Sequence, residues 1–478
     1  MAKPRMETRH VPAPETPAET RVRSAVPGIA WPAIPAANGA AMLALLFQME
    51  QSQWWPPARL RARQRDQLAA LLAHAAARVP FYRGRVPPDL PEGADWEEAW
   101  RRIPVLSRDE IQAADATEAL LAEELPPGHG EWREIHTSGS TGRPVRSVRS
   151  QLWELIWHGF TLRDHLWHRR DLGGRLAAIR ESGAGKATWP DGSAAPSWGL
   201  ASDAVFATGP LVSLNVLTPV AQQAEWLLRQ DPDYLLTHPS IARRLAAECL
   251  ARGVRPARLR QVITIAETLA PDVRGACAEA WGAKVADIYS AREAGYLALQ
   301  CPDHPHHHVQ AEGVFLEVLR DDGTPCAPGE VGRVVVTPLH NLAMPLIRYD
   351  IGDAAEVGPP CPCGRGLPVL RRILGRVQDM LILPGGERRW PLLSSSDLAA
   401  LLAAAPGLRA HQLVQTALDR LELRVEVAHP LAPREAAALA DWARARFGER
   451  FAVTVREVAG LPRSDAGKFR DFVCEAAP

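Results

Sequence analysis

The middle of the chain alternates short β-rich runs with helical runs, and this order constrains the fold more than any other feature of the sequence. The β-rich runs are DYLLT (233–237), QVITI (261–265) and KVADIY (284–289), and helical patterns fill the intervals at 241–251 and 270–281. Parallel strands need a crossover connection, which is usually a helix. The alternation therefore predicts parallel βαβ units in a layered α/β domain.

A different pattern begins past His308. The runs VFLEVL (314–319) and RVVVTPL (333–339) lie on either side of the turn-forming segment PGEVG. Such runs separated by a turn predict consecutive antiparallel strands. We expect them to form a β-rich subdomain of the large domain.

The C-terminal part predicts a small α+β domain. Strand patterns at 412–415, 421–427 and 451–458 accompany a helical pattern at 433–447, which begins at a proline. Proline is favoured in the first turn of a helix because its missing N–H has no partner there.

These patterns divide the chain into four parts. Residues 1–38 are rich in Pro, Ala, Glu and Arg without an apolar period, so we expect a disordered arm and assign it no function. Residues 39–374 form the large N-terminal domain, in which 59–77 reads as an amphipathic scaffold helix. Residues 375–379 connect it to the small domain, 380–478.

Composition narrows the class of protein. A chain of 478 residues is too long for one compact core, and its 55 basic residues balance its 55 acidic ones. Bulk charge therefore favours neither nucleic acid nor an anionic membrane as partner, and a small molecule is expected. Apolar runs such as 40–47 are far shorter than the roughly 20 residues of a membrane span. With no signal-peptide pattern at the N-terminus, we expect a cytoplasmic protein.

The sharpest local motif is HTSGSTGRP at 136–144. Its glycines allow a tight loop whose N–H groups and hydroxyls can surround phosphate oxygens. The order differs from that of a Walker loop, which excludes the kinase and GTPase classes. Taken alone, the segment also fits a solvated Ser/Gly linker. The candidate phosphate ligands are Thr137, Ser138, Gly139, Ser140, Thr141 and Gly142.

This motif resembles the phosphate loop of the adenylate-forming superfamily, which contains acyl-CoA synthetases, luciferases and peptide-synthetase adenylation domains. Four further stretches match that superfamily in order, so the resemblance spans residues 136 to 470. The phenylacetate–CoA ligase branch is the most similar, because it lacks the lysine usually found after the proline of the loop, and this chain has Val145 there.

The second matching stretch is DIYSARE at 287–293. By resemblance, Tyr289 stacks on adenine and Glu293 helps to hold magnesium. An aromatic face suits a base, and a hard dication prefers carboxylate oxygen. On its own, the stretch would be a core tyrosine and a surface glutamate. Ser290 and Arg292 depart from the usual Gly and Ser/Thr.

Weaker or shorter matches add three residues of the nucleotide site. AETL at 266–269 resembles the superfamily's Gly-Glu-x-Leu turn, which places Glu267 near the nucleotide. Asp353 ends a Tyr-x-x-Gly-Asp segment and would accept the ribose hydroxyls, although a lone Gly-Asp pair is more often a turn. Arg376 belongs to a segment similar to the Gly-Arg-x-Asp-Asp hinge, with Gln378 in place of the first Asp.

The fifth stretch, LPRSDAGKFR at 461–470, resembles the C-terminal catalytic loop of the superfamily. Its lysine, Lys468, would reach the α-phosphate and the carboxylate of the acid. A mobile cation suits this step, because two anions approach one another and charge builds further in the transition state. Lys468 and Glu293 are therefore the predicted catalytic residues.

The same branch often carries zinc, and its elements are recognisable in CPDHPHHH at 301–308 and CPCG at 361–364. The predicted ligands are Cys301, His308, Cys361 and Cys363, with His304 as a competitor for the imidazole position. Three thiolates and one imidazole form a closed structural site. The alternative is a surface histidine cluster with a Cys-Pro-Cys-Gly turn.

The resemblance implies a large domain that holds ATP, magnesium and a carboxylic acid, and a small mobile domain that rotates about 376–379. The acid, aromatic or otherwise hydrophobic, becomes an acyl-adenylate and is then transferred to coenzyme A. An amine or a carrier-protein thiol is the alternative acceptor. A catalytically weakened adenylate-binding or zinc-stabilised scaffold is the alternative class of protein. The sequence leaves the acid and the oligomeric state open.

Overall fold

The computed structural model describes residues 21–113, 116–136, 145–183, 185–383, 385–391, 393, 395–464 and 467–476. The predicted phosphate ligands Thr137 to Gly142 lie outside these ranges.

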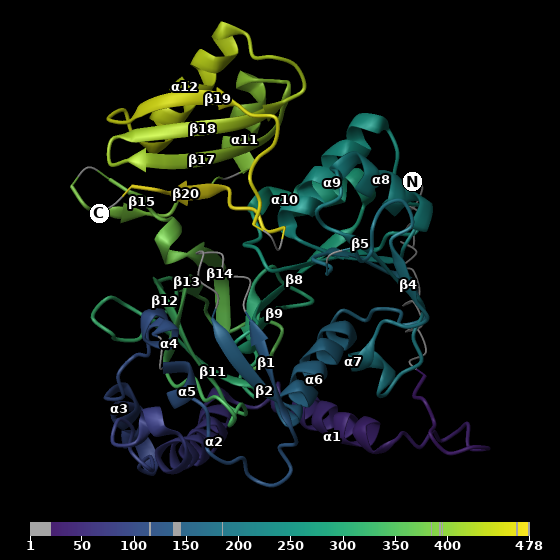
Figure 1. The fold of residues 1–478 in the computed structure, drawn as a ribbon, viewed down its shortest axis with the longest axis vertical. Coiled ribbons are helices and arrows are strands. Elements are labelled where there is room, and N and C mark those ends of the chain that lie inside the picture. Colours follow the sequence, from purple (N-terminus) through teal and green to yellow (C-terminus); the bar gives the residue numbers. More distant parts are fainter. Residues whose placement is uncertain are drawn as a thin grey trace, which may run out of the picture.

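A twelve-stranded mixed sheet runs through the larger part of the described chain, in the order β11-β12-β13-β14-β10-β9-β8-β7-β6-β3-β5-β4 (Figure 1). One half of the sheet is formed by the strands that come first in the sequence. In this half, β5, β3, β6, β7 and β8 are parallel neighbours, and β4 pairs antiparallel with β5. The predicted parallel βαβ units are therefore confirmed. These strands are β3 (Leu176–Arg180), β4 (Ser193–Ala195), β5 (Leu211–Asn215), β6 (Tyr234–Thr237), β7 (Gln261–Ile265) and β8 (Lys284–Ala291).

The other half of the sheet is antiparallel. Strands β11 and β12 pair antiparallel as predicted. Strand β9 pairs antiparallel with β8, so the β-rich part continues the same sheet as the parallel part. These strands are β9 (Gly295–Gln300), β10 (His307–Val309), β11 (Val314–Leu319), β12 (Val331–Pro338), β13 (Tyr349–Val357) and β14 (Val369–Arg376).

Helices cover both faces of the parallel half. The helices α8 (Val220–Gln230), α9 (Pro239–Arg252) and α10 (Pro271–Trp281) share one apolar core with β3, β6 and β7. The helices α1 (Ala37–Ser52) and α6 (Gln151–Trp167) contribute to a second core with other side chains of these strands. Both α9 and α10 begin at a proline and end at a left-handed glycine, Gly253 and Gly282, and each residue type is favoured at that end of a helix.

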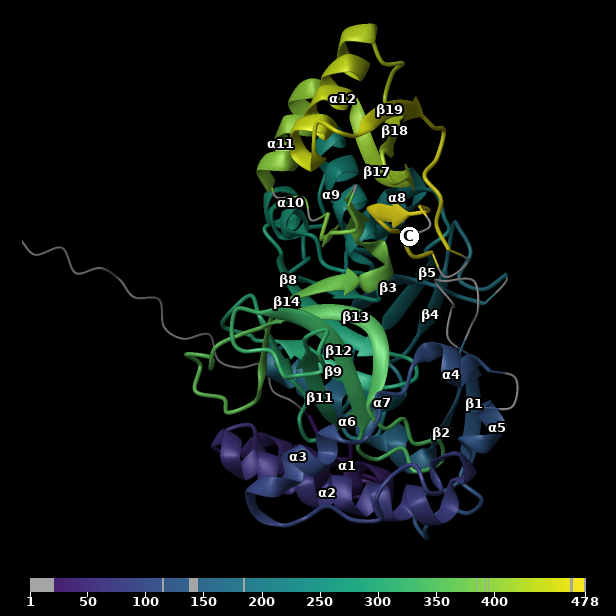
Figure 2. The ribbon, with the colours of Figure 1, turned by 90° about the vertical axis from the view of Figure 1, so that its left-hand side faces the viewer.

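The N-terminal elements pack at the far end of the molecule from the small C-terminal unit (Figure 1 and Figure 2). The helix predicted at 59–77 is α2, and its buried face includes Leu60, Leu68, Leu71 and Leu72. Helix α2 spans Pro57–Arg78. The other elements of this part are α3 (Trp96–Arg101), α4 (Arg108–Gln112), α5 (Ala116–Ala119), β1 (Trp132–His136), β2 (Arg146–Ser150) and the 3-10 turns Pro80–Tyr82 and Gly93–Asp95. The short helix α7 (Leu200–Asp203) comes later in the chain, between β4 and β5.

Part of the predicted disordered arm has a defined place. Val22 pairs with Phe206 in an isolated antiparallel bridge, and the N–H of Arg23 donates to the carbonyl of Val205 over 2.7 Å. Composition alone does not reveal these contacts, because their partners lie far along the sequence. Helix α1 begins at Ala37, just inside the expected arm.

The C-terminal unit is a four-stranded sheet in the order β19-β18-β17-β20, with two helices and its own apolar core (Figure 2). Its elements are β17 (Leu408–Ala417), β18 (Arg420–Val427), β19 (Ala452–Glu457), β20 (Phe472–Cys474), α11 (Ser395–Ala404) and α12 (Pro433–Phe447), preceded by a 3-10 turn (Val377–Asp379) and the pair β15 (Leu381–Ile382) and β16 (Arg388–Arg389). Among the described residues, no helix has both the length and the apolar content needed to cross a bilayer.

Candidate active site

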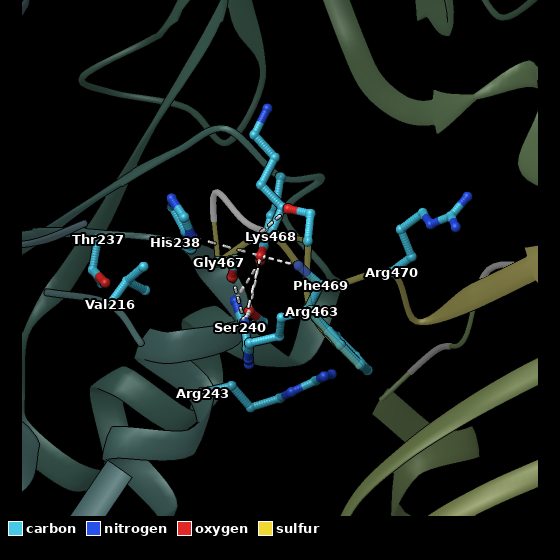
Figure 3. A network of polar contacts seen from close by, with 12 residues as sticks. Val216, Thr237, His238, Ser240, Arg243, Arg463, Gly467, Lys468, Phe469 and Arg470 are labelled. Carbon is cyan, nitrogen blue, oxygen red and sulfur yellow. Dashed lines mark hydrogen bonds and ion pairs between the residues drawn. The ribbon is translucent and has the colours of Figure 1, made fainter. Parts of the chain in front are cut away.

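The predicted site residues gather where the parallel strands end. Glu267 follows β7, Tyr289 lies near the end of β8, and Glu293 follows β8. Open α/β sheets bind ligands outside the carboxyl ends of their parallel strands. The C-terminal loop that carries Lys468 lies against this same edge (Figure 3).

Tyr289, Asp353 and Arg376 form one polar chain. The hydroxyl of Tyr289 donates to Oδ2 of Asp353 over 2.8 Å, and Nε of Arg376 lies 3.1 Å from Oδ1 of the same carboxylate. Asp353 and Arg376 are register partners on β13 and β14, which fixes their separation. Burial raises the pKa of Tyr289 well above its ordinary value, so its hydroxyl stays a donor at neutral pH. Both groups therefore hold the Asp353 carboxylate in place.

Glu293 is buried and has a cation beside it. Nη1 of Arg108, at the start of α4, lies 4.0 Å from its carboxylate. Burial, then Arg376 and Arg292, lower the pKa of Lys468, and Glu293 offsets part of this effect. Arg292, the departure from the superfamily pattern, forms an ion pair of 2.7 Å with Glu181. The edge thus combines one carboxylate suited to a metal with several cations suited to phosphate.

The carboxylate of Glu267 is occupied by protein groups. Ser240 donates to it from both its backbone N–H and its hydroxyl, each over 3.0 Å, and the N–H of Phe469 donates over 2.6 Å. Burial raises the pKa of Glu267. The predicted contact of Glu267 with nucleotide therefore stays a prediction, and the side chain itself faces the C-terminal loop.

Ala266 stands where the superfamily has glycine, and the structure explains that preference. Its φ is +71°, in the left-handed region that costs an L-residue roughly 1–2 kcal/mol. We expect Ala266→Gly to raise the free energy of unfolding by roughly 0.5–1 kcal/mol, since part of the gain is lost to the entropy of the unfolded chain. The measurement is the denaturant midpoint.

The control for this prediction is Ala276→Gly, in the interior of α10, which should lower the free energy of unfolding by about 1 kcal/mol. A loss of stability in both variants would contradict the strain at Ala266.

The C-terminal loop docks on α9 through residues to which the sequence assigned no role. Nη1 of Arg463 donates to Oγ of Ser240 and to the carbonyl of Gly467, each over 2.9 Å (Figure 3). Arg463 lies inside the predicted catalytic motif, but Ser240 gave no signal beyond its place after a strand. Gly467 has a φ of +72°, and a Cβ added to it would lie 2.2 Å from Cγ1 of Val216. Only glycine fits this approach without a shift.

Four predicted metal ligands meet at a second site. The donor atoms of Cys301, His308, Cys361 and Cys363 all lie within 4.8 Å of one another. The sulfurs of Cys301 and Cys361 are 3.9 Å apart, and the sulfur of Cys363 is 3.5 Å from Nε2 of His308. Tetrahedral zinc with bonds of about 2.3 Å to sulfur separates two sulfurs by about 3.8 Å. The donor set and its spacing therefore fit zinc.

His304, the competing imidazole, is not in this group. Its ring stacks on His306 with centroids 5.4 Å apart, and the strand β10 carries His308 inward instead. Burial lowers the pKa of His308 to about 3, which keeps its imidazole in the neutral form that metals bind.

The fold is that of the adenylate-forming CoA ligases. The structure of 2-hydroxyisobutyryl-CoA ligase in the postadenylation state, in complex with R3-HIB-AMP, matches with a TM-score of 0.68 at 21% identity over 89% of this chain and 91% of that one. The same enzyme in the thioesterification state, with 2-HIB-AMP and CoA, matches with a TM-score of 0.56 over 89% of this chain and 92% of that one. The arrangement of the present chain is therefore closer to the postadenylation structure.

In sequence, the chain is similar to phenylacetate-coenzyme A ligases, which confirms the predicted resemblance. The enzyme from Thermus thermophilus is 28% identical over 456 residues, covering 87% of this chain and 96% of that protein. The enzyme from Pseudomonas putida is 26% identical over 214 residues, covering 43% of this chain and 48% of that protein. No family model matches the chain.

Proposed function

We propose that the protein is an AMP-forming acid–thiol ligase, which activates a carboxylic acid with ATP and transfers the acyl group to coenzyme A. The observation that carries the proposal is the docking of the described part of the 461–470 loop on Glu267 and Ser240, which brings the backbone of Lys468 next to the end of β7. The CoA ligases to which the chain is similar support coenzyme A over an amine or a carrier protein.

In the first half-reaction, an oxygen of the substrate carboxylate attacks the α-phosphorus of ATP, and the bond from this phosphorus to the pyrophosphate oxygen breaks. Asp353, held by Tyr289 and Arg376, accepts the ribose hydroxyls and so orients the nucleotide. Lys468 offsets the negative charge that builds between carboxylate and phosphate. The predicted 137–142 loop holds the departing pyrophosphate.

In the second half-reaction, the thiol of coenzyme A gives its proton to solvent and its sulfur attacks the acyl carbonyl, and AMP leaves with the electron pair of the broken carbon–oxygen bond. The small domain, 380–478, would rotate about 375–379 between the two steps and withdraw Lys468 from the large domain, 39–374. The interface that would open includes ion pairs, such as Arg243 with Asp471, 2.7 Å, and Arg244 with Glu426, 3.0 Å. Polar interfaces of this kind can separate without exposing an apolar core.

Two metals complete the proposal. Glu293 would hold magnesium, which neutralises part of the triphosphate charge when bound. Cys301, His308, Cys361 and Cys363 would hold a structural zinc ion, because a closed set of four ligands has no position for substrate. The seven free cysteines favour a reducing, cytoplasmic location.

The test of the proposed function is pyrophosphate release from ATP across a panel of aryl, fatty and amino acids, with and without coenzyme A. We expect one class of acid, with phenylacetate tested first, to give release that coenzyme A accelerates. Release that an amine accelerates instead would move the protein to the alternative acceptor. No release with any acid would favour the scaffold alternative.

Gly467→Ala offers a second test of loop docking. The added methyl group meets Val216 and forces a left-handed alanine, so the loop cannot lie in its observed place. We expect adenylate formation to slow roughly tenfold or more, because small displacements of a reacting group have large effects on rate. Pyrophosphate release measures this, with Gly460→Ala as control, since a Cβ there meets no atom within 4 Å. Equal rates in the two variants would contradict docking.

A further inference from the structure

We propose that Glu267 is a positioning residue, whose carboxylate holds the backbone next to Lys468 and thereby places the lysine ammonium for adenylate formation. This inference rests on the proposed function. It assigns Glu267 a task toward the C-terminal loop, in place of the nucleotide contact that the sequence motif predicts. The task is specific to one arrangement of the two domains.

Both carboxylate oxygens of Glu267 accept hydrogen bonds from the protein. Oε2 accepts the backbone N–H of Ser240 over 3.0 Å, which ties the carboxylate to the first turn of α9. Oε1 accepts the N–H of Phe469 over 2.6 Å, and the hydroxyl of Ser240 over 3.0 Å. One carboxylate therefore joins the large domain to the residue that follows Lys468. The side chain is only 6% exposed, so water does not compete for these positions.

Hydrogen bonds within the loop hold its backbone around this contact. The N–H of Lys468 donates to Oγ of Ser464 over 3.1 Å, and its carbonyl accepts the N–H of Ser464 over 2.9 Å. Arg463 bridges Ser240 to the carbonyl of Gly467. The described residues of the loop are thus tied to one another, and whatever fixes the backbone of Phe469 also helps to fix where the side chain of Lys468 begins (Figure 3).

The groups around Glu267 also offset the cost of burying its charge. An ionised carboxylate is costly to bury unless donors converge on it. Glu267 has three donor groups and the guanidinium of Arg463 at 3.8 Å, and its charge also favours the ammonium of Lys468. His238, 3.7 Å away, adds little charge, because burial lowers its pKa to about 4.

These donors come from both domains, so the full set of contacts exists only when the small domain is docked on the large one. If the small domain rotates, Glu267 loses Phe469 and Arg463 together and keeps only Ser240. A contact present in one state and absent in the other stabilises the first. Glu267 should therefore serve the first half-reaction and be dispensable in the second.

The test compares the two half-reactions in Glu267→Gln. Glutamine has one acceptor oxygen, so its NH2 group must face the N–H of either Ser240 or Phe469, and the anchor fails on one side. We expect adenylate formation to slow on the order of 10²-fold through kcat. Thioester formation from supplied acyl-adenylate and coenzyme A should stay within about twofold of the wild type, since Lys468 is withdrawn in that step.

The matched control is Glu356→Gln. Glu356 is another buried glutamate, on β13, and its carboxylate is paired with Arg371 and Arg372 of β14. We expect both of its half-reactions to follow the wild type. Equal losses in both half-reactions of Glu267→Gln, or an unchanged adenylation rate, would overturn the inference.

Hydrogen exchange separates this inference from the proposed function. The amide of Phe469 should exchange slowly in the wild type and in Glu356→Gln, and at least tenfold faster in Glu267→Gln, whether or not any acid is activated. If the wild type activates no acid, the proposed function fails, and this exchange pattern decides alone whether Glu267 anchors the loop. Unchanged protection of Phe469 in Glu267→Gln would overturn the anchor.

Discussion

Lys468→Ala is expected to slow adenylate formation by roughly 10²- to 10³-fold, the range seen when one electrostatic contact to a developing charge is removed. The reason lies in the surroundings of Lys468, which is half-buried, so few water molecules could replace its charge. Single-turnover pyrophosphate release with the acid identified in the panel measures the effect. Supplied acyl-adenylate should still be converted to thioester at nearly the wild-type rate.

Lys468→Arg is the control for charge. Guanidinium keeps a positive charge at every pH used but differs in shape, so partial activity is expected. If Lys468→Ala slows both half-reactions equally, the lysine acts through stability or through both steps, and the division of labour proposed above is wrong.

The pH profile of the wild type follows from the same surroundings. Burial, then Arg376 and Arg292, lower the pKa of Lys468, so its ammonium form is lost at a lower pH than in an exposed lysine. If that ammonium drives adenylation, kcat/KM should fall as pH rises through the lowered pKa, since this parameter reports on the free enzyme. The fall should be absent in Lys468→Arg.

The βαβ order was predictable because its signals are local. Each strand between 233 and 289 is a short apolar run, and the helices between them begin at Pro239 and Pro271 and end at glycine. Proline and glycine act on the backbone of their own residue, so their effect does not depend on the rest of the fold. The sheet continues from β8 through a hairpin into β9 and then into β10, which pairs with β14 much further along the chain. The sequence patterns did not predict this long-range pairing.

The candidate site also contains residues that local motifs predict and a contact that only the docking of the two domains reveals. Lys468, Glu293, Tyr289 and Asp353 stand in motifs, and the structure places them at one edge of the sheet. The partner of Glu267, in contrast, lies 202 residues further along the chain. A contact of this length depends on how two domains dock, and no local pattern encodes it.

The pairing register of β10 with β14 distinguishes His308 from His304 as the histidine beside the cysteines. His308 pairs with Val369 in the strand that follows Cys361 and Cys363, so its register brings it beside those cysteines. His304 precedes β10 and has no such pairing. Spacing in the sequence left both histidines open, because each follows Cys301 closely enough to reach a common ion.

Cys361→Ala is expected to remove the zinc and to lower the free energy of unfolding by about 4 kcal/mol, the linkage value for an ion present at a thousand times its dissociation constant. The four ligands come from three segments of the antiparallel half: the end of β9, strand β10, and the connection from β13 to β14. An ion joining them stabilises the folded state, because the unfolded chain does not hold the ligands together. Metal analysis and denaturant unfolding measure the two effects.

Cys326→Ala is the matched control, since Cys326 is a partly buried cysteine outside the ligand group. It should retain one zinc per chain and nearly full stability. Because three thiolates and one imidazole fill a tetrahedral ion, the zinc has no position for substrate. Cys361→Ala should therefore keep its kcat at temperatures where it stays folded. A zinc-free wild type, or a Cys361→Ala variant that unfolds like the control, would contradict a structural metal, whereas a loss of kcat without a loss of stability would assign the ion a part in the reaction.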